Sequence, residues 1–245
     1  AQREQAVELV LDHLSRLGDP CHDPEPDILQ GRGRQLHDVS RLIGELTEAF
    51  AGKVRAKDVQ RLLTGDSVQL DKLGLSDFEA QVVAGAVRLR NRQMQYLTLN
   101  GNRAFGLVGA RAFAAALEAR GRQLASLLLA DCGLGDEGAE ALADALRVNN
   151  TLRILDMRQN RLTDRAAQAL ASALPENAAL ESLYLNNDRW SSEDHRNAIG
   201  DDGAWALALA LAESPAELKV SLVLNPVSDD TKEQVKGAVG KRIRF

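Results

Sequence analysis

The side chains in this sequence that could do chemistry are few and do not group into a recognisable site. Cys21 and His22 are adjacent and could begin a metal site, but no second Cys or His pair follows at a suitable spacing. His13 and His37 fall on predicted helices, so we expect no metal site. The Gly-Arg-Gly-Arg stretch at 31–34 has glycines like those of a phosphate-binding loop, yet no strand precedes it and no Gly-Lys-Ser or Gly-Lys-Thr follows.

Cys132 is not a candidate nucleophile either, because it occupies a fixed position in a repeated segment, where a structural role explains it. The predicted strands of that segment bring together no His with a Ser or Cys, no run of acids and no basic stripe. The sequence therefore predicts a protein that is not an enzyme and that uses no cofactor and no metal.

The composition indicates a soluble folded protein. The 245 residues are 44% hydrophobic and 27% charged but only 4% aromatic, so Leu and Ala must form a core of thin layers. The net charge of −5 gives no reason to expect nucleic acid or an anionic membrane as a partner. No apolar run approaches the roughly 18 residues needed for membrane insertion. Two cysteines form no disulfide framework, which favours an intracellular, cytoplasmic location. The first residue is Ala rather than Met, which leaves open import into an organelle by a removed targeting segment.

A segment with a period of 28 residues is repeated along the chain. One copy has apolar or small side chains in a fixed frame, at Leu124, Leu127, Leu129, Cys132 and Leu134. The next copies have Leu152, Leu155, Met157, Asn160 and Leu162, and then Leu180, Leu183, Leu185, Asp188 and Trp190. Upstream, the frame continues at Met94, Leu97, Leu99 and Asn102. We count six units, which start near residues 68, 94, 124, 152, 180 and 218.

These repeats resemble the leucine-rich repeat family. The 28-residue period, the alternation of Cys132 with Asn102 and Asn160, and the GDEGAEALADAL helix are similar to its ribonuclease-inhibitor subclass. The resemblance covers about residues 66–240 and is interrupted at Leu73, where Asn or Cys would be expected, and in the region 187–198. It implies an α/β fold, a leucine-rich repeat solenoid or horseshoe of about six strand–helix units.

Residues 1–65 contain no repeat and are predicted to form an α-helical N-terminal region, followed by the repeat domain at 66–245. Apolar residues share one helical face near 7–17, 36–50 and 56–63, so we expect a cap over the open end of the repeat core. An F-box-like docking module is the alternative, although the chain lacks the Leu-Pro start of that module. The basic end 241–245 is predicted to be a solvated terminus or a cap.

The predicted inner face of the strands contains the candidate binding residues, because strand residues alternate between the core and the opposite face. The expected partner-binding residues are Tyr96, Thr98, Asn100, Leu128, Ile154, Asp156, Arg158, Tyr184, Asn186, Arg189 and Trp190. Tyr and Arg are favoured anchors of protein interfaces. The alternative is a solvated sheet face without a partner.

About nine residues are inserted in the fifth repeat, within 187–198. In one interpretation, Trp190 fills the core position that Leu162 fills in the preceding repeat, and the residues after it loop out. In the other, Ile199 fills that position and Trp190 stands on an exposed loop. The direct continuation of the repeat frame through Trp190 favours the first. In both we expect the charged residues of the loop to project from the scaffold: Arg189, Glu193, Asp194, His195 and Arg196.

The sequence thus predicts a non-catalytic protein-binding scaffold that acts alone or within a multi-subunit complex. It would bind its protein partner through the concave strand face and the 187–198 loop. The alternative is a GTPase-activating regulator of the Ran GTPase-activating protein type, with Arg103, Arg161 and Arg189 as candidate residues. That family's extended loop and acidic tail have no match here. A third possibility is the sensor end of a larger receptor.

Overall fold

The computed structural model describes residues 12, 43–89, 91–189 and 193–245. Several predictions from the sequence lie outside this range: the helix near 7–17, most of the helix near 36–50, the Cys21–His22 pair, the glycines of 31–34, and Trp190.

In the described part of the chain, seven short parallel strands form one open sheet in the order of the sequence. They are β1 (Ser67–Gln69), β2 (Tyr96–Thr98), β3 (Ser126–Leu128), β4 (Ile154–Asp156), β5 (Ser182–Tyr184), β6 (Lys219–Ser221) and β7 (Ile243–Arg244). The central residues of β2 to β5 lie side by side in register, and all four are leucines of the repeat frame. The repeats predicted from the sequence are therefore confirmed, because each of them contributes one strand to the sheet.

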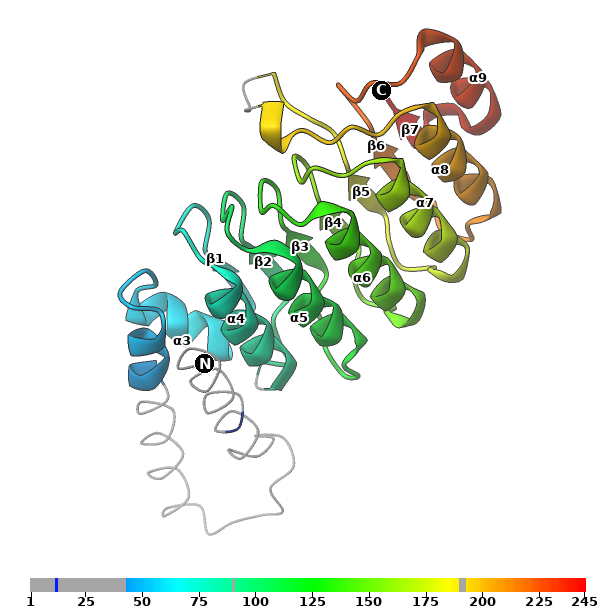
Figure 1. Ribbon diagram of the computed structural model, residues 1–245. Helices are drawn as coiled ribbons and strands as arrows, with labels where there is room; N and C mark the ends of the chain where they lie inside the picture. The colour runs from blue at the N-terminus through cyan, green and yellow to red at the C-terminus, as the bar shows by residue number, and fades with distance from the viewer. Residues whose placement is uncertain (1–11, 13–42, 90, 190–192) are drawn as a thin grey trace.

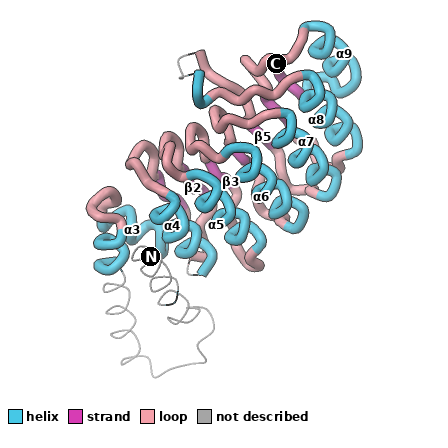
Figure 2. Tube along the Cα trace, viewed as in Figure 1, coloured by secondary structure: helices cyan, strands magenta, loops and turns pink. Residues whose placement is uncertain are grey.

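Helices connect the strands and cover one face of the sheet (Figure 1). They are α3 (Ala56–Thr64), α4 (Asp77–Leu89), α5 (Gly106–Glu118), α6 (Gly135–Val148), α7 (Asp164–Ala173), α8 (Asp201–Glu213) and α9 (Asp229–Val239), with 3-10 turns η1 (Leu174–Glu176), η2 (Glu193–His195) and η3 (Gly240–Arg242). Figure 2 shows the helices as one row and the strands as a second row beside them. This is the α/β leucine-rich repeat solenoid that the sequence predicts.

A single apolar core runs between the two rows. It extends from Leu46 and Phe50, through the strand leucines, to Ile243 of β7. At the N-terminal end, α3 contacts β1 and α4 and buries Val59, Leu62 and Leu63. At the other end, the segment 241–245 does more than end the chain, because its β7 pairs with β6 and extends the sheet. Both ends of the repeat core are thus covered by other segments, since an uncovered end would expose leucines to water.

The turn after each strand is held by a buried side chain that bonds the backbone of neighbouring repeats. Asn160 is fully buried, and its Oδ1 accepts hydrogen bonds from the backbone N–H of Cys132 at 2.9 Å and of Leu134 at 3.2 Å. Asn102 makes the equivalent bonds one repeat earlier. The Cys132 Sγ donates to the carbonyl of Leu99 at 3.2 Å, and burial raises the pKa of this thiol to about 12. The structural role predicted for Cys132 is confirmed, and the two asparagines that alternate with it in the repeat frame have the same role.

The fifth repeat differs from the preferred prediction. Asn197, not Asp188, holds its turn: the Asn197 Oδ1 accepts from the N–H of Asn160 at 2.8 Å and of Leu162 at 3.0 Å. Ile199 is fully buried in the core position that the sequence frame assigned to Trp190, and Asp188 is exposed. The physical reason is that the side chain at this position donates to buried backbone carbonyls, as those of Asn160 and Cys132 do, and a carboxylate cannot donate. The insertion therefore precedes the turn asparagine instead of following it.

A second set of buried asparagines holds the opposite edge, where each helix leads into the next strand. The Asn177 Nδ2 donates to the carbonyls of Leu146 and Asn149, at 2.7 and 2.9 Å, and its Oδ1 accepts from the N–H of Leu180 at 2.8 Å. Asn91 and Asn149 make similar bonds. Sequence reasoning missed this set, although each member stands three residues before a core residue of the repeat frame.

Carboxylates at the helix starts join successive helices. The Asp136 Oδ1 accepts from the N–H of Thr163 at 2.8 Å, and the Asp164 Oδ1 accepts from the N–H groups of Gly200 and Gly203 at 2.6 and 3.0 Å. Gly203 must be glycine, because a Cβ there would lie 2.6 Å from that same oxygen. These bonds and the two asparagine sets fix the repeats against one another, so the strand face is a rigid surface.

Candidate protein-binding face

The face of the sheet that points away from the helices, here called the concave face, displays two tyrosines. Tyr96 on β2 is 51% exposed and Tyr184 on β5 is 38% exposed, and three strand spacings separate them. At about 4.8 Å per spacing, and with an offset of two residues along the strand, their backbones lie roughly 16 Å apart. Exposed tyrosines at this separation can both contact one protein partner.

The residues between the two tyrosines form two rows across β2 to β5. In the first row, Tyr96 is followed by Ser126, Ile154 and Ser182, and in the second, Thr98 is followed by Leu128, Asp156 and Tyr184. Ile154 and Leu128 are half-buried, and Ser126 is only 6% exposed between its larger neighbours. The concave-face residues predicted on these four strands are thus brought together as one surface with an aliphatic centre.

Asp156 and Arg158 act as a unit at the edge of this surface. The Arg158 Nε lies 2.9 Å from both carboxylate oxygens of Asp156, and its Nη2 lies 2.6 Å from Oδ2. The Asp156 side chain is 2% exposed, whereas that of Arg158 is 43% exposed. Hydrogen bonding to Asp156 raises the pKa of Arg158, so its charge is permanent. Asp156 therefore orients Arg158, and only Arg158 of this pair offers its charge to a partner.

The two asparagines of the predicted set, Asn100 and Asn186, are half-buried and partly used by the scaffold. The Asn100 Oδ1 accepts from the N–H of Ala130 at 2.9 Å, and the Asn186 Nδ2 donates to the carbonyl of Asn187 at 3.3 Å. They help to shape the turns and leave the tyrosines, the aliphatic centre and Arg158 as the main accessible groups.

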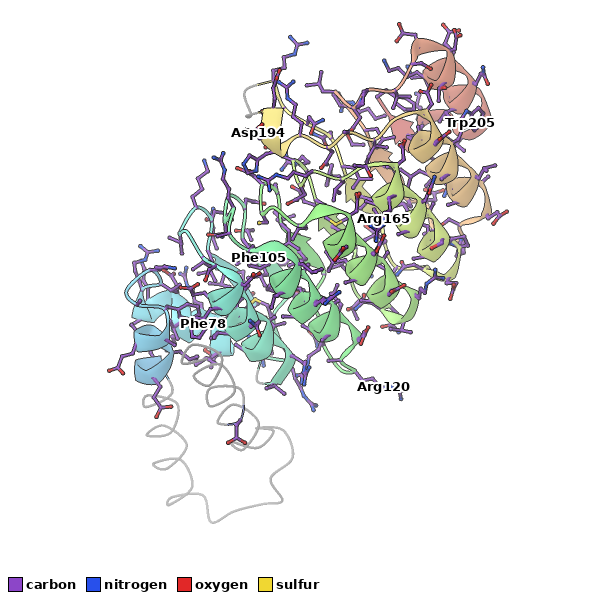
Figure 3. All side chains as sticks on the ribbon, in the orientation of Figure 1. Phe78, Phe105, Arg120, Arg165, Asp194 and Trp205 are labelled. Carbon is purple, nitrogen blue, oxygen red and sulfur yellow. The ribbon has the colours of Figure 1, made fainter. Side chains whose placement is uncertain are left out.

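The inserted loop does not project freely. It folds back over the turns of earlier repeats, where the His195 Nδ1 lies 3.1 Å from the Asp131 Oδ1, and Asp131 also accepts from the Arg103 Nε at 2.9 Å. The Arg161 Nε donates to the carbonyl of Asp194 at 2.8 Å. Figure 3 shows Asp194 at the edge of the solenoid opposite to that of Arg120. Arg161 thus fastens the loop to the scaffold, and Arg103 bonds Asp131, the residue that His195 contacts.

The prediction that all charged residues of this loop project is therefore wrong for His195, whose side chain is 12% exposed. Glu193, with a side chain that is 90% exposed, does project, and Arg189 is also exposed. The physical reason is that the imidazole finds Asp131 and Arg161 within reach, which no pattern in the sequence indicates.

Two asparagines close the base of the loop. The backbone N–H of Asn197 donates to the Asn187 Oδ1 at 2.8 Å, and the Asn187 Nδ2 donates to the carbonyl of Asn197, also at 2.8 Å. The same Nδ2 reaches the carbonyl of Leu224 in the next repeat at 3.0 Å. We call this pair of residues the asparagine clasp. It keeps the repeat register on both sides of the insertion.

The described residues offer neither a metal site nor a membrane-spanning helix. No group of three or more His, Cys, Asp or Glu side chains among them is placed to hold a metal ion. Within the same ranges, no helix has the length and apolar character that crossing a membrane requires.

Comparison with known proteins agrees with the repeat geometry. A family model described as leucine-rich repeat matches residues 124–143 and 148–171, within the third and fourth repeats. The pig (Sus scrofa) ribonuclease inhibitor is 32% identical over 105 residues, which is 42% of this chain and 23% of that protein. The chain is a leucine-rich repeat protein. It is of the ribonuclease-inhibitor-like kind.

Another relative matches a shorter part of this leucine-rich repeat protein, and a solved structure matches a longer part. The human (Homo sapiens) centrosomal protein of 78 kDa is 45% identical over 73 residues, 30% of this chain but only 10% of that protein. A solved structure titled Leiomodin-1 Actin-Binding Site 2 superposes with a TM-score of 0.51 at 20% identity, covering 69% of this chain and 90% of that chain. That likeness shows the fold alone. Together the fold and the relatives support a protein-interaction scaffold.

Proposed function

We propose that this protein is a non-catalytic scaffold that binds a protein partner on the concave face of β2 to β5, with the 187–198 loop at the rim. The observation that supports this most directly is the pair of exposed tyrosines, Tyr96 and Tyr184, on a strand surface held rigid by buried hydrogen bonds. Tyr and Arg dominate the binding energy of many protein interfaces, and Tyr buries a large area at a small entropic cost.

The chemistry of the surface also favours binding over catalysis. The Cys132 thiol is fully buried with its pKa raised to about 12, so it is neither accessible nor ionised at neutral pH. Arg158 is already neutralised in part by Asp156 and is suited to hold a partner's polar group in a fixed orientation. A relative named ribonuclease inhibitor is consistent with a solenoid that engages another protein.

The names of the relatives also support an intracellular location and a place within a larger assembly, since one of them is a centrosomal protein. We propose both for this chain. The cytoplasm is the compartment that fits a protein with two cysteines and no disulfide framework.

The experiment compares proteins captured from an extract of the source cell by the wild-type chain and by the double variant Tyr96→Ala/Tyr184→Ala. We expect a partner that binds the wild type and is lost with the variant. With that partner purified, each single substitution should weaken binding roughly tenfold, as losing about 1.4 kcal/mol at an interface anchor requires.

The matched control is Val148→Ala, at a side chain that is 68% exposed on α6, among the helices that cover the opposite face. It should bind like the wild type, and all variants should keep their melting temperature because the residues changed are exposed. Equal binding by the double variant and the wild type would refute the concave face as the interface. Acceleration of GTP hydrolysis by any member of a panel of small GTPases would refute the non-catalytic role.

A further inference from the structure

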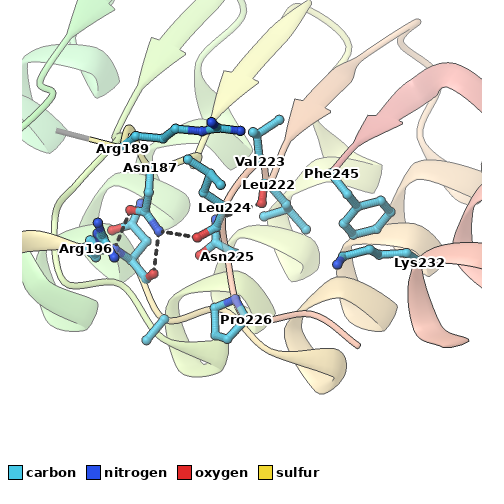
Figure 4. Close-up of a pocket in the computed structure, with 12 residues that line it drawn as sticks. Asn187, Arg189, Arg196, Leu222, Val223, Leu224, Asn225, Pro226, Lys232 and Phe245 are labelled. Atoms are coloured by element: carbon cyan, nitrogen blue, oxygen red, sulfur yellow. Dashed lines mark hydrogen bonds between the residues drawn. The ribbon is translucent and has the colours of Figure 1, made fainter. Parts of the chain in front are cut away.

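A groove of about 690 Å³ lies between the inserted loop and the last repeat, apart from the strand residues proposed above. Figure 4 shows Arg189 and Arg196 of the loop region on one side, Lys232 of α9 and Phe245 on the other, and the segment after β6 between them. The floor of the groove is apolar, with residues that include Leu222, Leu224 and Pro226. Three segments that are distant in sequence thus meet around one hollow.

The charge of the groove is one-sided. Of the described residues that line it, Arg189, Arg196 and Lys232 are cations and none is Asp or Glu. Arg196 has Glu193 at 3.8 Å, and Lys232 has Asp229 at 2.9 Å, but these carboxylate side chains are 90% and 96% exposed. Pairs so open to water contribute little. The cations therefore remain available to an anionic ligand, in a chain whose net charge is −5.

Leu224 is an unusual residue for its place in the repeat. The described residues at this turn position in the other repeats are polar or glycine: Lys72, Gly101, Asp131, Gln159 and Asn187. Leu224 has a φ of +61° and its residue is 46% exposed. Lys72, Asp131 and Gln159 share this left-handed φ at the same turn position, so the backbone conformation belongs to the repeat turn. Leu224 differs from them in its exposed apolar side chain, which is available to cover an apolar group of a ligand.

We propose that this groove binds an extended acidic segment of a partner protein, in which carboxylates flank an apolar side chain. The carboxylates would pair with Arg189 and Arg196 on one wall and with Lys232 on the other. The apolar side chain would cover Leu224 and the neighbouring ring of Phe245. Charge complementarity selects an acidic partner, and a lining with several aliphatic side chains and a single aromatic ring favours a peptide over a nucleic acid, whose successive bases each stack on an aromatic ring.

This inference goes beyond the concave-face proposal and can fail separately from it. The groove shares Arg189 and Arg196 with the rim loop of that proposal, but Leu224, Lys232 and Phe245 lie outside both the loop and β2 to β5. A variant of the concave face should therefore leave the groove intact, and a variant of the groove should leave the concave face intact.

The test uses a fluorescein-labelled hexapeptide, Glu-Leu-Glu-Glu-Leu-Glu, and measures its fluorescence anisotropy with the full chain. We expect saturable binding that weakens as salt is added, because ion pairs are screened. Leu224→Asn should weaken binding about tenfold; Asn tolerates the left-handed conformation, so this variant removes the apolar contact and keeps the turn. Lys232→Glu should weaken binding more than tenfold.

Two controls separate specific from general effects. Lys57→Glu, at an exposed site on α3, makes the same change of charge far from the groove and should bind the peptide like the wild type, as should Tyr184→Ala. Any of four results would overturn the proposal: no saturable binding, equal binding of the peptide with Lys in place of Glu, an equal loss with Lys57→Glu, or tighter binding of a labelled oligothymidylate of similar charge.

Discussion

The position of Asn197 provides the sharpest test of the structure, because the sequence frame favours Asp188 in its place. Asn197 is 2% exposed, and its side chain makes four hydrogen bonds to backbone groups of two repeats. Asn197→Ala would leave the N–H groups of Asn160 and Leu162 buried and unpaired, along with the carbonyls of Met157 and Leu185 that its Nδ2 reaches at 3.1 and 2.8 Å.

The magnitude follows from the two donors. A buried donor left without a partner costs about 1–3 kcal/mol, and the carbonyls, with a second lone pair each, cost less. We expect Asn197→Ala to lower the free energy of unfolding by about 4 kcal/mol. For a protein of this length, that corresponds to a fall in melting temperature of roughly 8–16 °C. Asp188→Ala, at an exposed residue, should cost under about 1 kcal/mol.

The measurement is urea unfolding followed by circular dichroism and by tryptophan fluorescence on the same samples. A fluorescence transition at lower urea than the circular-dichroism transition would show that the C-terminal repeats, which contain both tryptophans, unfold first. Asn186→Ala is the matched control, because its side chain is half-buried and donates a single long bond at 3.3 Å. If Asp188→Ala proved more destabilising than Asn197→Ala, the assignment of the turn residue in this repeat would be wrong, and with it the placement of Ile199 in the core.

Two further predictions concern titrating groups. In a Cys21→Ser background, Cys132 should react with a thiol reagent at neutral pH only as the protein unfolds, because its thiol is buried. Above pH 9.0 the Cys132 thiol ionises in the unfolded chain but not in the folded one. The free energy of unfolding should therefore fall by about 1.4 kcal/mol per pH unit more than it does in Cys132→Ala. Rapid reaction under native conditions, or the same slope in both proteins, would contradict its burial. At Glu79, burial raises the pKa, but hydrogen bonds from Lys53 and Ser76 outweigh it and hold the pKa below 4.5. The stability that ionised Glu79 contributes is therefore present above that pH and is lost as the pH falls. In urea unfolding, Glu79→Gln should lower the free energy of unfolding by roughly 1–3 kcal/mol at pH 7 and by less at pH 3. An equal loss at both pH values would contradict the ion pair.

The repeat architecture was predictable from the sequence because each unit must bury the same face. Leu127, Leu155 and Leu183 recur at a fixed interval, and only strands stacked in register bring such residues into one core. Cys132 and Asn160 could be assigned to the turn for the same reason. The strand positions could be predicted from the periodicity of the apolar residues, because the same short pattern recurs in every repeat.

The insertion could not be predicted in the same way. The frame runs on through Asp188, and the apolar pattern does not show that the turn needs a side chain that donates hydrogen bonds. The contact of His195 with Asp131 joins residues of separate repeats and has no local signal at all. By contrast, the second asparagine set had a local signal in the sequence, since Asn149 and Asn177 both stand three residues before a core leucine.

The asparagine clasp allows the loop between residues 187 and 197 to be replaced by another sequence. Because its two ends are pinned at hydrogen-bond distance, the flanking repeats do not depend on how many residues connect them or on what those residues are. A sequence of different length, chosen for a different target, could be grafted at this place without disturbing the solenoid. Natural variation among related chains would be tolerated there on the same physical ground.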